Sequence, residues 1–103
     1  METPIYEIIM LEESVKIDKF GWPNYGQSEN VGFYYEEETA FKAVKENWCD
    51  INDSGKYRAA FVVQKIPGLY PITIVKGYFI YNKKDNNFRQ AVLPKEWENF
   101  NIS

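Results

Sequence analysis

Residues 31–70 decide the fold; they read VGFYY (31–35), EEETAFKAVKENWCDI (36–51), NDSGK (52–56) and YRAAFVVQKIPGLY (57–70). The first segment is short and aromatic, which is typical of a strand. In the middle segment the apolar residues change to the spacing of a helix. The last segment alternates with a period of two until Pro67 and Gly68 end it. The stretch therefore predicts a strand, a helix and a second strand.

The predicted helix carries signals at both of its ends. Three glutamates open it, and the backbone dipole stabilises each negative charge in a first turn by ~0.3–1 kcal/mol. Asn47 and the polar cluster at 50–55 end it. We interpret the glutamates as a charged helix start and not as a metal site, because hard cations need oxygen ligands that converge from a loop. Five residues form the apolar face of the helix: Ala40, Phe41, Val44, Trp48 and Ile51.

The flanking segments predict further strands. Residues 5–11 are apolar on both sides, which favours a central strand covered on each face. Residues 15–20 alternate and are predicted to pair with that strand as a hairpin. Residues 71–81 predict a long strand, in which Gly77 indicates a bulge or a close backbone approach. Residues 88–93 return as a strand after a polar hairpin loop.

After the last predicted strand comes Pro94, which suits the first position of a short helix. We therefore predict a single domain, residues 1–103, of the α+β class. It has a mostly antiparallel sheet of about five or six strands, one main helix packed on one face and a short C-terminal helix. The unit at 31–70 fits either antiparallel pairing of its two strands or a right-handed βαβ crossover.

Composition excludes several functions. The chain has a net charge of −3 and no basic run, which argues against direct binding of duplex nucleic acid. It has no histidine, which excludes Ser-His-Asp and Cys-His catalysis and the histidine-dependent metal sites. Its single cysteine, Cys49, is predicted to be a reduced, half-buried thiol without a functional role. We expect no enzyme activity, no cofactor and no bound metal.

The N-terminus has an acidic flank and only a short apolar run, so we expect no signal peptide and no membrane contact. We predict a cytoplasmic protein. The chain holds eight Tyr, seven Phe and three Trp, more than one small core hides comfortably. We therefore expect some aromatic rings in a cleft or interface, and a homo-oligomer in which the 71–81 strand lies at a sheet edge.

The candidate ligand site centres on residues 21–30, GWPNYGQSEN, which are predicted to form the long irregular loop. Trp22 and Tyr25 are the candidate stacking faces, unless both fold back to cover the edge of the core. Arg89, beside Phe88, and then Arg58 are the candidate anion anchors, because a guanidinium binds phosphate as a planar fork. The alternative for each arginine is a solvated surface charge.

The central stretch resembles a group of small phage and prophage proteins from low-GC Gram-positive bacteria. The positions that carry the resemblance are Gly32-Phe33, Asn47, Asp50-Ile51, Tyr57 and Gly68-Leu69-Tyr70. Members follow the Tyr-led strand with acidic residues, whereas this chain has Gln64 and Lys65. The resemblance implies a phage counter-defence protein in a bacterial host cell. The central stretch is similar to the sponge proteins that sequester the cyclic ADP-ribose-type signals of Thoeris immunity.

Two non-catalytic functions stay open. The first is sequestration of a small anionic nucleotide, which needs aromatic faces for a base and cations for phosphate. The second is inhibition of a host defence protein such as a nuclease, through an acidic and aromatic surface.

Overall fold

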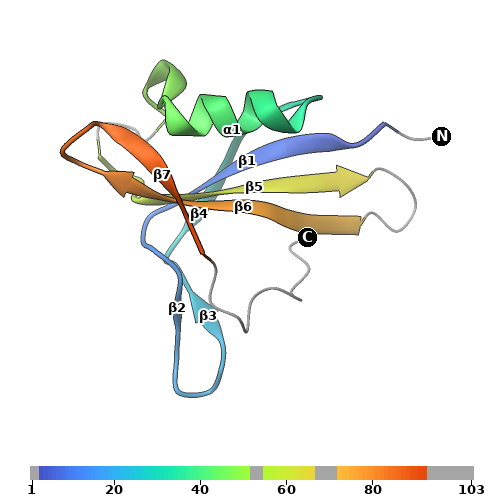
Figure 1. The fold of residues 1–103 in the computed structure, drawn as a ribbon. Helices are drawn as coiled ribbons and strands as arrows, with labels where there is room; N and C mark the ends of the chain where they lie inside the picture. The colour runs from blue at the N-terminus through green and yellow to red at the C-terminus, as the bar shows by residue number, and fades with distance from the viewer. Residues whose placement is uncertain (1–2, 52–54, 67–71, 93–103) are drawn as a thin grey trace.

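The structure is a computed structural model that describes residues 3–51, 55–66 and 72–92, and it is built on one five-stranded antiparallel sheet (Figure 1). The strands lie in the order β4-β1-β5-β6-β7. Their bounds are Ser28–Tyr34 for β4, Ile5–Leu11 for β1, Ala59–Ile66 for β5, Ile72–Asn82 for β6 and Asn87–Ala91 for β7. A separate hairpin joins β2 (Lys16–Ile17) to β3 (Pro23–Asn24).

The α+β class predicted from the sequence is wrong. Strands make up 51% of the described residues and helical residues 14%, so the fold is β-rich with one α-helix, α1 (Glu37–Lys45). Part of the difference lies at residues 28–30, which the sequence assigned to a loop and which begin β4. These residues are polar and exposed. The sequence therefore lacks, at this point, the alternation of apolar and polar residues that would indicate a strand. The helix predicted from Pro94 onward lies outside the described residues.

The strand β1 settles how the central unit is arranged. It pairs antiparallel with β4 on one side and with β5 on the other. The strands β4 and β5 therefore run parallel to each other with β1 between them, and α1 connects them across one face of the sheet (Figure 1). The predicted pairing of residues 15–20 with β1 is wrong, because Lys16 and Ile17 pair with Asn24 and Pro23.

The helix α1 ends earlier than the sequence pattern indicates. Asn47 adopts a left-handed conformation (φ 51°) directly after the last turn, and its N–H donates to the carbonyl of Val44 at 3.0 Å. Asparagine tolerates this conformation better than most residues. Trp48 therefore lies in a short 3₁₀ turn (Trp48–Asp50) and packs at the margin of the core on the helix side. The buried residues of α1 are Ala40, Ala43 and Val44.

Each face of the sheet has its own apolar cluster. The helix covers the cluster that contains Ile8, Met10, Val62 and Phe79. On the opposite face, residues of the β2–β3 hairpin region pack against a second cluster: Leu11, Ala59, Phe61, Val63 and Tyr78. The two faces of β1 are thus both covered, as its sequence predicts.

The long strand β6 lies at an edge of the sheet over part of its length. Its second half, Tyr78–Asn82, runs between β5 and β7, whereas residues 72–77 lie beside β5 and pair with no other strand among the described residues. The predicted edge location of residues 71–81 is therefore wrong for residues 78–81 and holds for residues 72–77, and self-association stays a prediction.

Candidate functional site

The structure separates the five residues predicted to form a ligand site. Trp22 lies on the β2–β3 hairpin and is 63% exposed. Tyr25 turns inward and packs edge-on against Phe61, with the ring centroids 6.1 Å apart. Phe88 is 1% exposed and belongs to the core on the helix side. Phe88 is therefore not presented to a ligand, and Tyr25 does not offer a free stacking face.

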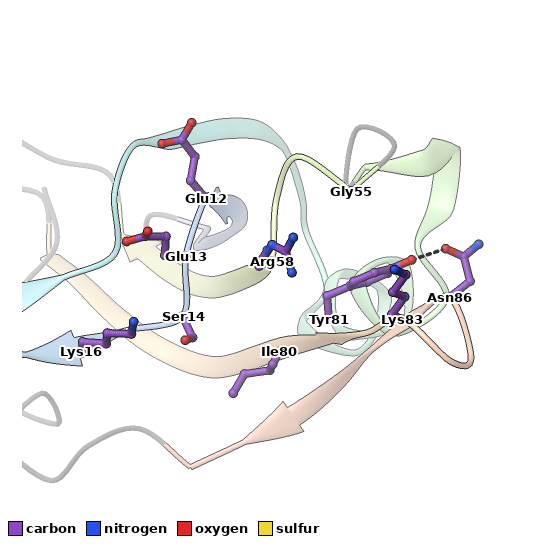
Figure 2. A pocket seen from close by; sticks show the side chains of 10 residues that line it. All are labelled: Glu12, Glu13, Ser14, Lys16, Gly55, Arg58, Ile80, Tyr81, Lys83 and Asn86. Atoms are coloured by element: carbon purple, nitrogen blue, oxygen red, sulfur yellow. Dashed lines mark hydrogen bonds between the residues drawn. The ribbon is translucent and has the colours of Figure 1, made fainter.

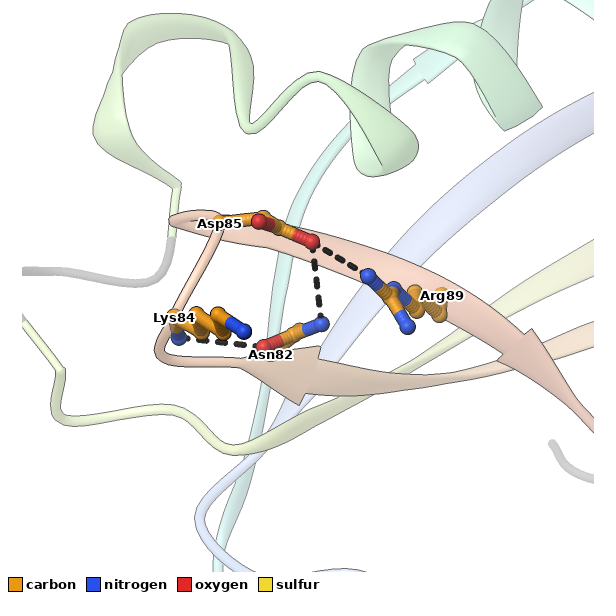
Figure 3. Close-up of polar contacts among 4 residues, drawn as sticks. All are labelled: Asn82, Lys84, Asp85 and Arg89. Carbon is orange, nitrogen blue, oxygen red and sulfur yellow. Dashed lines mark hydrogen bonds and ion pairs between the residues drawn. The ribbon is translucent and has the colours of Figure 1, made fainter.

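The two arginines differ in their surroundings. Arg89 projects from β7 and forms an ion pair with Asp85 in the β6–β7 turn (Figure 3). The same turn is held by Asn82, whose amide donates to Asp85 and whose side-chain oxygen accepts the N–H of Lys84. Arg58 instead lines a cleft and makes no ion pair with any residue that the structure describes.

We call this hollow the Arg58 cleft; its volume is about 810 Å³, and it lies between the β1–β2 connection, the start of β5 and the β6–β7 hairpin. Ligand pockets in proteins commonly span ~300–1,000 Å³, so the cleft has room for a nucleotide-sized molecule. Figure 2 shows the side chains around it. The cleft is lined by Glu12, Glu13, Ser14, Lys16, Gly55, Arg58, Ile80, Tyr81, Lys83 and Asn86.

Arg58 is fixed at its backbone on both sides. Its N–H donates to the carbonyl of Leu11 at 2.9 Å, and its carbonyl accepts the N–H of Tyr81 at 2.8 Å. These bonds tie the residue to the neighbouring strands just before β5 begins. In Figure 2 the side chain lies between Glu13 on one side and Tyr81 on the other. An anchored backbone whose guanidinium pairs with no described residue suits a binding site for phosphate or carboxylate.

The wall formed by the β6–β7 hairpin contributes polar and apolar groups. The hydroxyl of Tyr81 donates to the side-chain oxygen of Asn86 at 2.6 Å (Figure 2). Lys83 lies beside them and makes no ion pair within the described part of the chain. Ile80 is 40% exposed and gives the cleft an apolar surface. A ligand with a charged end and a flat apolar part would find both kinds of contact here.

The β2–β3 hairpin extends away from the five-stranded sheet (Figure 1) and ends in a tip that we define as residues 18–24. The carboxylate of Asp18 organises this tip. It accepts the N–H groups of Phe20 at 2.8 Å and Trp22 at 2.9 Å, and the amide of Asn24 at 3.3 Å. The bond from Trp22, with those from Phe20 and Asn24, lowers the pKa of Asp18, because each bond favours the ionised form. The tip presents Phe20 and Trp22, which are 74% and 63% exposed.

Neither a metal site nor a membrane-spanning helix is found in the parts that the structure covers. Residues 3–51, 55–66 and 72–92 contain no group of three or more His, Cys, Asp or Glu side chains arranged to hold a metal ion. Among the same residues, no helix combines the length and apolar character needed to cross a bilayer.

Sequence reasoning missed most of the Arg58 cleft. Glu12, Glu13 and Lys16 lie more than sixty positions from Lys83 in the chain, and the order of the strands brings them together. The polar turns at 12–14 and 82–87 are visible in the sequence, but nothing local shows that they border the same hollow. If residues 15–20 had paired with β1 as predicted, the connection at residues 12–14 would have been a simple hairpin loop.

Comparisons of the chain with protein-family models, with curated proteins and with solved structures found no match in any of the three.

Proposed function

We propose that this protein is a non-catalytic binding protein that takes a small anionic ligand of the nucleotide class into the Arg58 cleft. The observation that carries the proposal is the difference in ion pairing between the two arginines of the chain. Arg89 is engaged by Asp85, whereas Arg58 lines the cleft with its guanidinium unpaired among the described residues. A guanidinium on an anchored backbone offers a phosphate paired, charge-assisted hydrogen bonds.

The charge balance of the cleft supports an anionic ligand. Lys16, Arg58 and Lys83 contribute three positive charges, and Glu12 and Glu13 contribute two negative charges. The described lining residues therefore carry a net charge of +1, in a chain whose net charge is −3. Because the chain has no histidine and the described lining of the cleft contains no nucleophile paired with a base, we propose binding and not catalysis.

The setting that we propose for this binding is phage counter-defence in the cytoplasm of a bacterial host. The support is the resemblance of the central stretch to small phage proteins, together with the size and charge of the cleft. On this proposal the protein sequesters an immune signal of the cyclic ADP-ribose type and releases it unchanged.

The test is isothermal titration calorimetry with cyclic ADP-ribose and with pyrophosphate as the two probes. The Arg58→Ala variant should bind both probes about 10- to 100-fold more weakly, the range for a lost hydrogen bond to a charged group. Arg89→Ala is the matched control: it removes the same group from a residue outside the cleft lining and should bind as the wild type does. Absence of wild-type binding to either probe at millimolar concentration would refute the proposal.

A second candidate function is inhibition of a host defence protein, and the hairpin tip favours it. Phe20 and Trp22 are exposed on a backbone that Asp18 holds in place, and aromatic residues on ordered surfaces dominate protein–protein hot spots. An inhibition assay with purified host nucleases tests this function. The Trp22→Ser variant should lose inhibition, whereas Phe33→Ser, an exposed aromatic residue on β4, should keep it.

A further inference from the structure

The segment that forms the acidic wall of the Arg58 cleft is anchored along its backbone. The N–H of Glu12 donates to the carbonyl of Gln27 at 3.0 Å, and the N–H of Glu13 donates to the carbonyl of Tyr25 at 3.1 Å. Gly26 allows this close approach, because a Cβ at position 26 would lie 3.2 Å from the Cβ of Glu12. The two carboxylates therefore start from fixed positions at the cleft.

The two carboxylates are used differently. Glu12 accepts the N–H of Gln27 at 3.1 Å through its side chain, so it has a structural task. The carboxylate of Glu13 is exposed and makes no hydrogen bond or ion pair with any of the described residues. An ionised carboxylate only accepts hydrogen bonds, so Glu13 offers a ligand acceptor oxygens and negative charge.

A ligand that fits both walls must carry two kinds of group. It needs anionic oxygens for Arg58 and Lys83, and hydrogen-bond donors for Glu13. A purely anionic ligand such as a free polyphosphate would be repelled by Glu13. It would also offer no hydrogen-bond donor to the acceptor oxygens of Glu13. A nucleotide combines a phosphate with the hydroxyl groups of ribose, and proteins commonly bind such hydroxyls with an acidic side chain.

We infer that Glu13 accepts hydrogen bonds from the ribose hydroxyls of the ligand, so that the Arg58 cleft selects ribonucleotides over their 2′-deoxy forms. This inference rests on the proposed function, because it concerns the ligand of the same cleft. It assigns the recognition of phosphate to Arg58 and the recognition of sugar to Glu13.

The experiment compares ADP, 2′-deoxy-ADP and pyrophosphate by calorimetry on the wild type and on Glu13→Gln. The wild type should bind ADP about 10-fold or more tightly than 2′-deoxy-ADP, the low end expected for a hydrogen bond to a charged group. Glu13→Gln should reduce that ratio, because the neutral amide oxygen is a weaker acceptor than the carboxylate. The same variant should bind pyrophosphate at least as tightly as the wild type does, because a repulsive charge has been removed.

The control is Glu38→Gln, which removes the same charge from an exposed position on α1 and should keep the wild-type ratio. Equal wild-type binding of ADP and 2′-deoxy-ADP would overturn the inference, and so would a ratio that persists in Glu13→Gln. In either case, binding of pyrophosphate that depends on Arg58 would leave the proposed function standing. If none of the three probes binds the wild type, both proposals are lost.

Discussion

The ring of Phe41 lies against the backbone of Gly77, so that a Cβ at position 77 would be 2.8 Å from the Cζ of Phe41. The same Cβ would lie 3.0 Å from the Cε2 of Phe79, whose ring meets Phe41 edge-on at 5.3 Å. The β5–β6 register shifts at this point, where Val62 faces Gly77 and Val63 faces Val75. The bulge and the missing side chain together let α1 approach the sheet, as the glycine in the strand pattern predicts.

Replacing Gly77 with alanine should therefore destabilise the fold. The added methyl group meets two aromatic rings, and overpacking of this kind typically costs about 1–3 kcal/mol. Urea unfolding followed by circular dichroism measures the change. In a Phe41→Leu background the same substitution should cost less, because Leu has no Cζ to meet the methyl group. An equal cost in both backgrounds would show that the strain comes from elsewhere.

Gly77 is an example of what local sequence alone can predict in this chain. A glycine inside an apolar strand indicates a close approach by itself, and a polar run after a helix indicates where the helix ends. Local sequence does not show which strand pairs with which, because the alternation of residues 15–20 fits any neighbouring strand. Their pairing with residues 23 and 24 depends on the tip network and on packing against Phe61. The Arg58 cleft depends on that pairing, so the alternation of residues 15–20 could not predict the cleft.

The buried face of α1 should not accept a charge. Val44 has no exposed surface, and a carboxylate placed there lacks a partner in the apolar cluster. The cost of several kcal/mol is comparable with the total stability of a small domain, ~5–15 kcal/mol. Val44→Asp should therefore unfold the protein in a thermal melt. Trp48→Asp should be less severe, because Trp48 is only half-buried. Equal melting temperatures for Val44→Asp and the wild type would contradict the packing described.

Cys49 is exposed, so the sequence-based prediction of a half-buried thiol is wrong. The residue has a φ of 55°, which turns its side chain out of the helical path. We expect a thiol reagent to modify Cys49 fully in the native state, without prior unfolding of the protein. We also expect Cys49→Asn to be at least as stable as the wild type, because asparagine tolerates a positive φ. Protection of the thiol until the protein unfolds would contradict this exposure.

Asp18 should control the order of the hairpin tip. Its pKa is lowered in the folded chain, so its stabilising effect is present above about pH 4 and is lost as the pH falls through the lowered value. Asp18→Ala should speed amide exchange at Phe20 and Trp22, measured by NMR. Asp85→Ala is the matched control on the other hairpin, and it should leave those two amides unchanged. Unchanged exchange in Asp18→Ala would show that the tip is held without its carboxylate.

The last prediction concerns Tyr57, which is 4% exposed and donates its hydroxyl hydrogen bond to the carboxylate of Glu29. The bond to Glu29, and then burial, raise the pKa of Tyr57, because a phenolate would lose the bond and face a negative charge. The folded state therefore holds this proton more tightly than the unfolded chain, in which tyrosine titrates near ~10.

The stabilising effect is complete below about pH 10 and is lost as the pH rises through the raised pKa of the folded state. Chemical unfolding at several pH values above and below about 10 should show wild-type stability falling at the alkaline end. Burial also raises the pKa of Tyr78, so part of this fall should remain in Tyr57→Phe. The Tyr57→Phe profile should nevertheless be flatter, whereas the profile of Tyr35→Phe, which changes an exposed ring, should match the wild type. If Tyr57→Phe and the wild type lose stability in parallel, the bond between Tyr57 and Glu29 does not couple folding to pH.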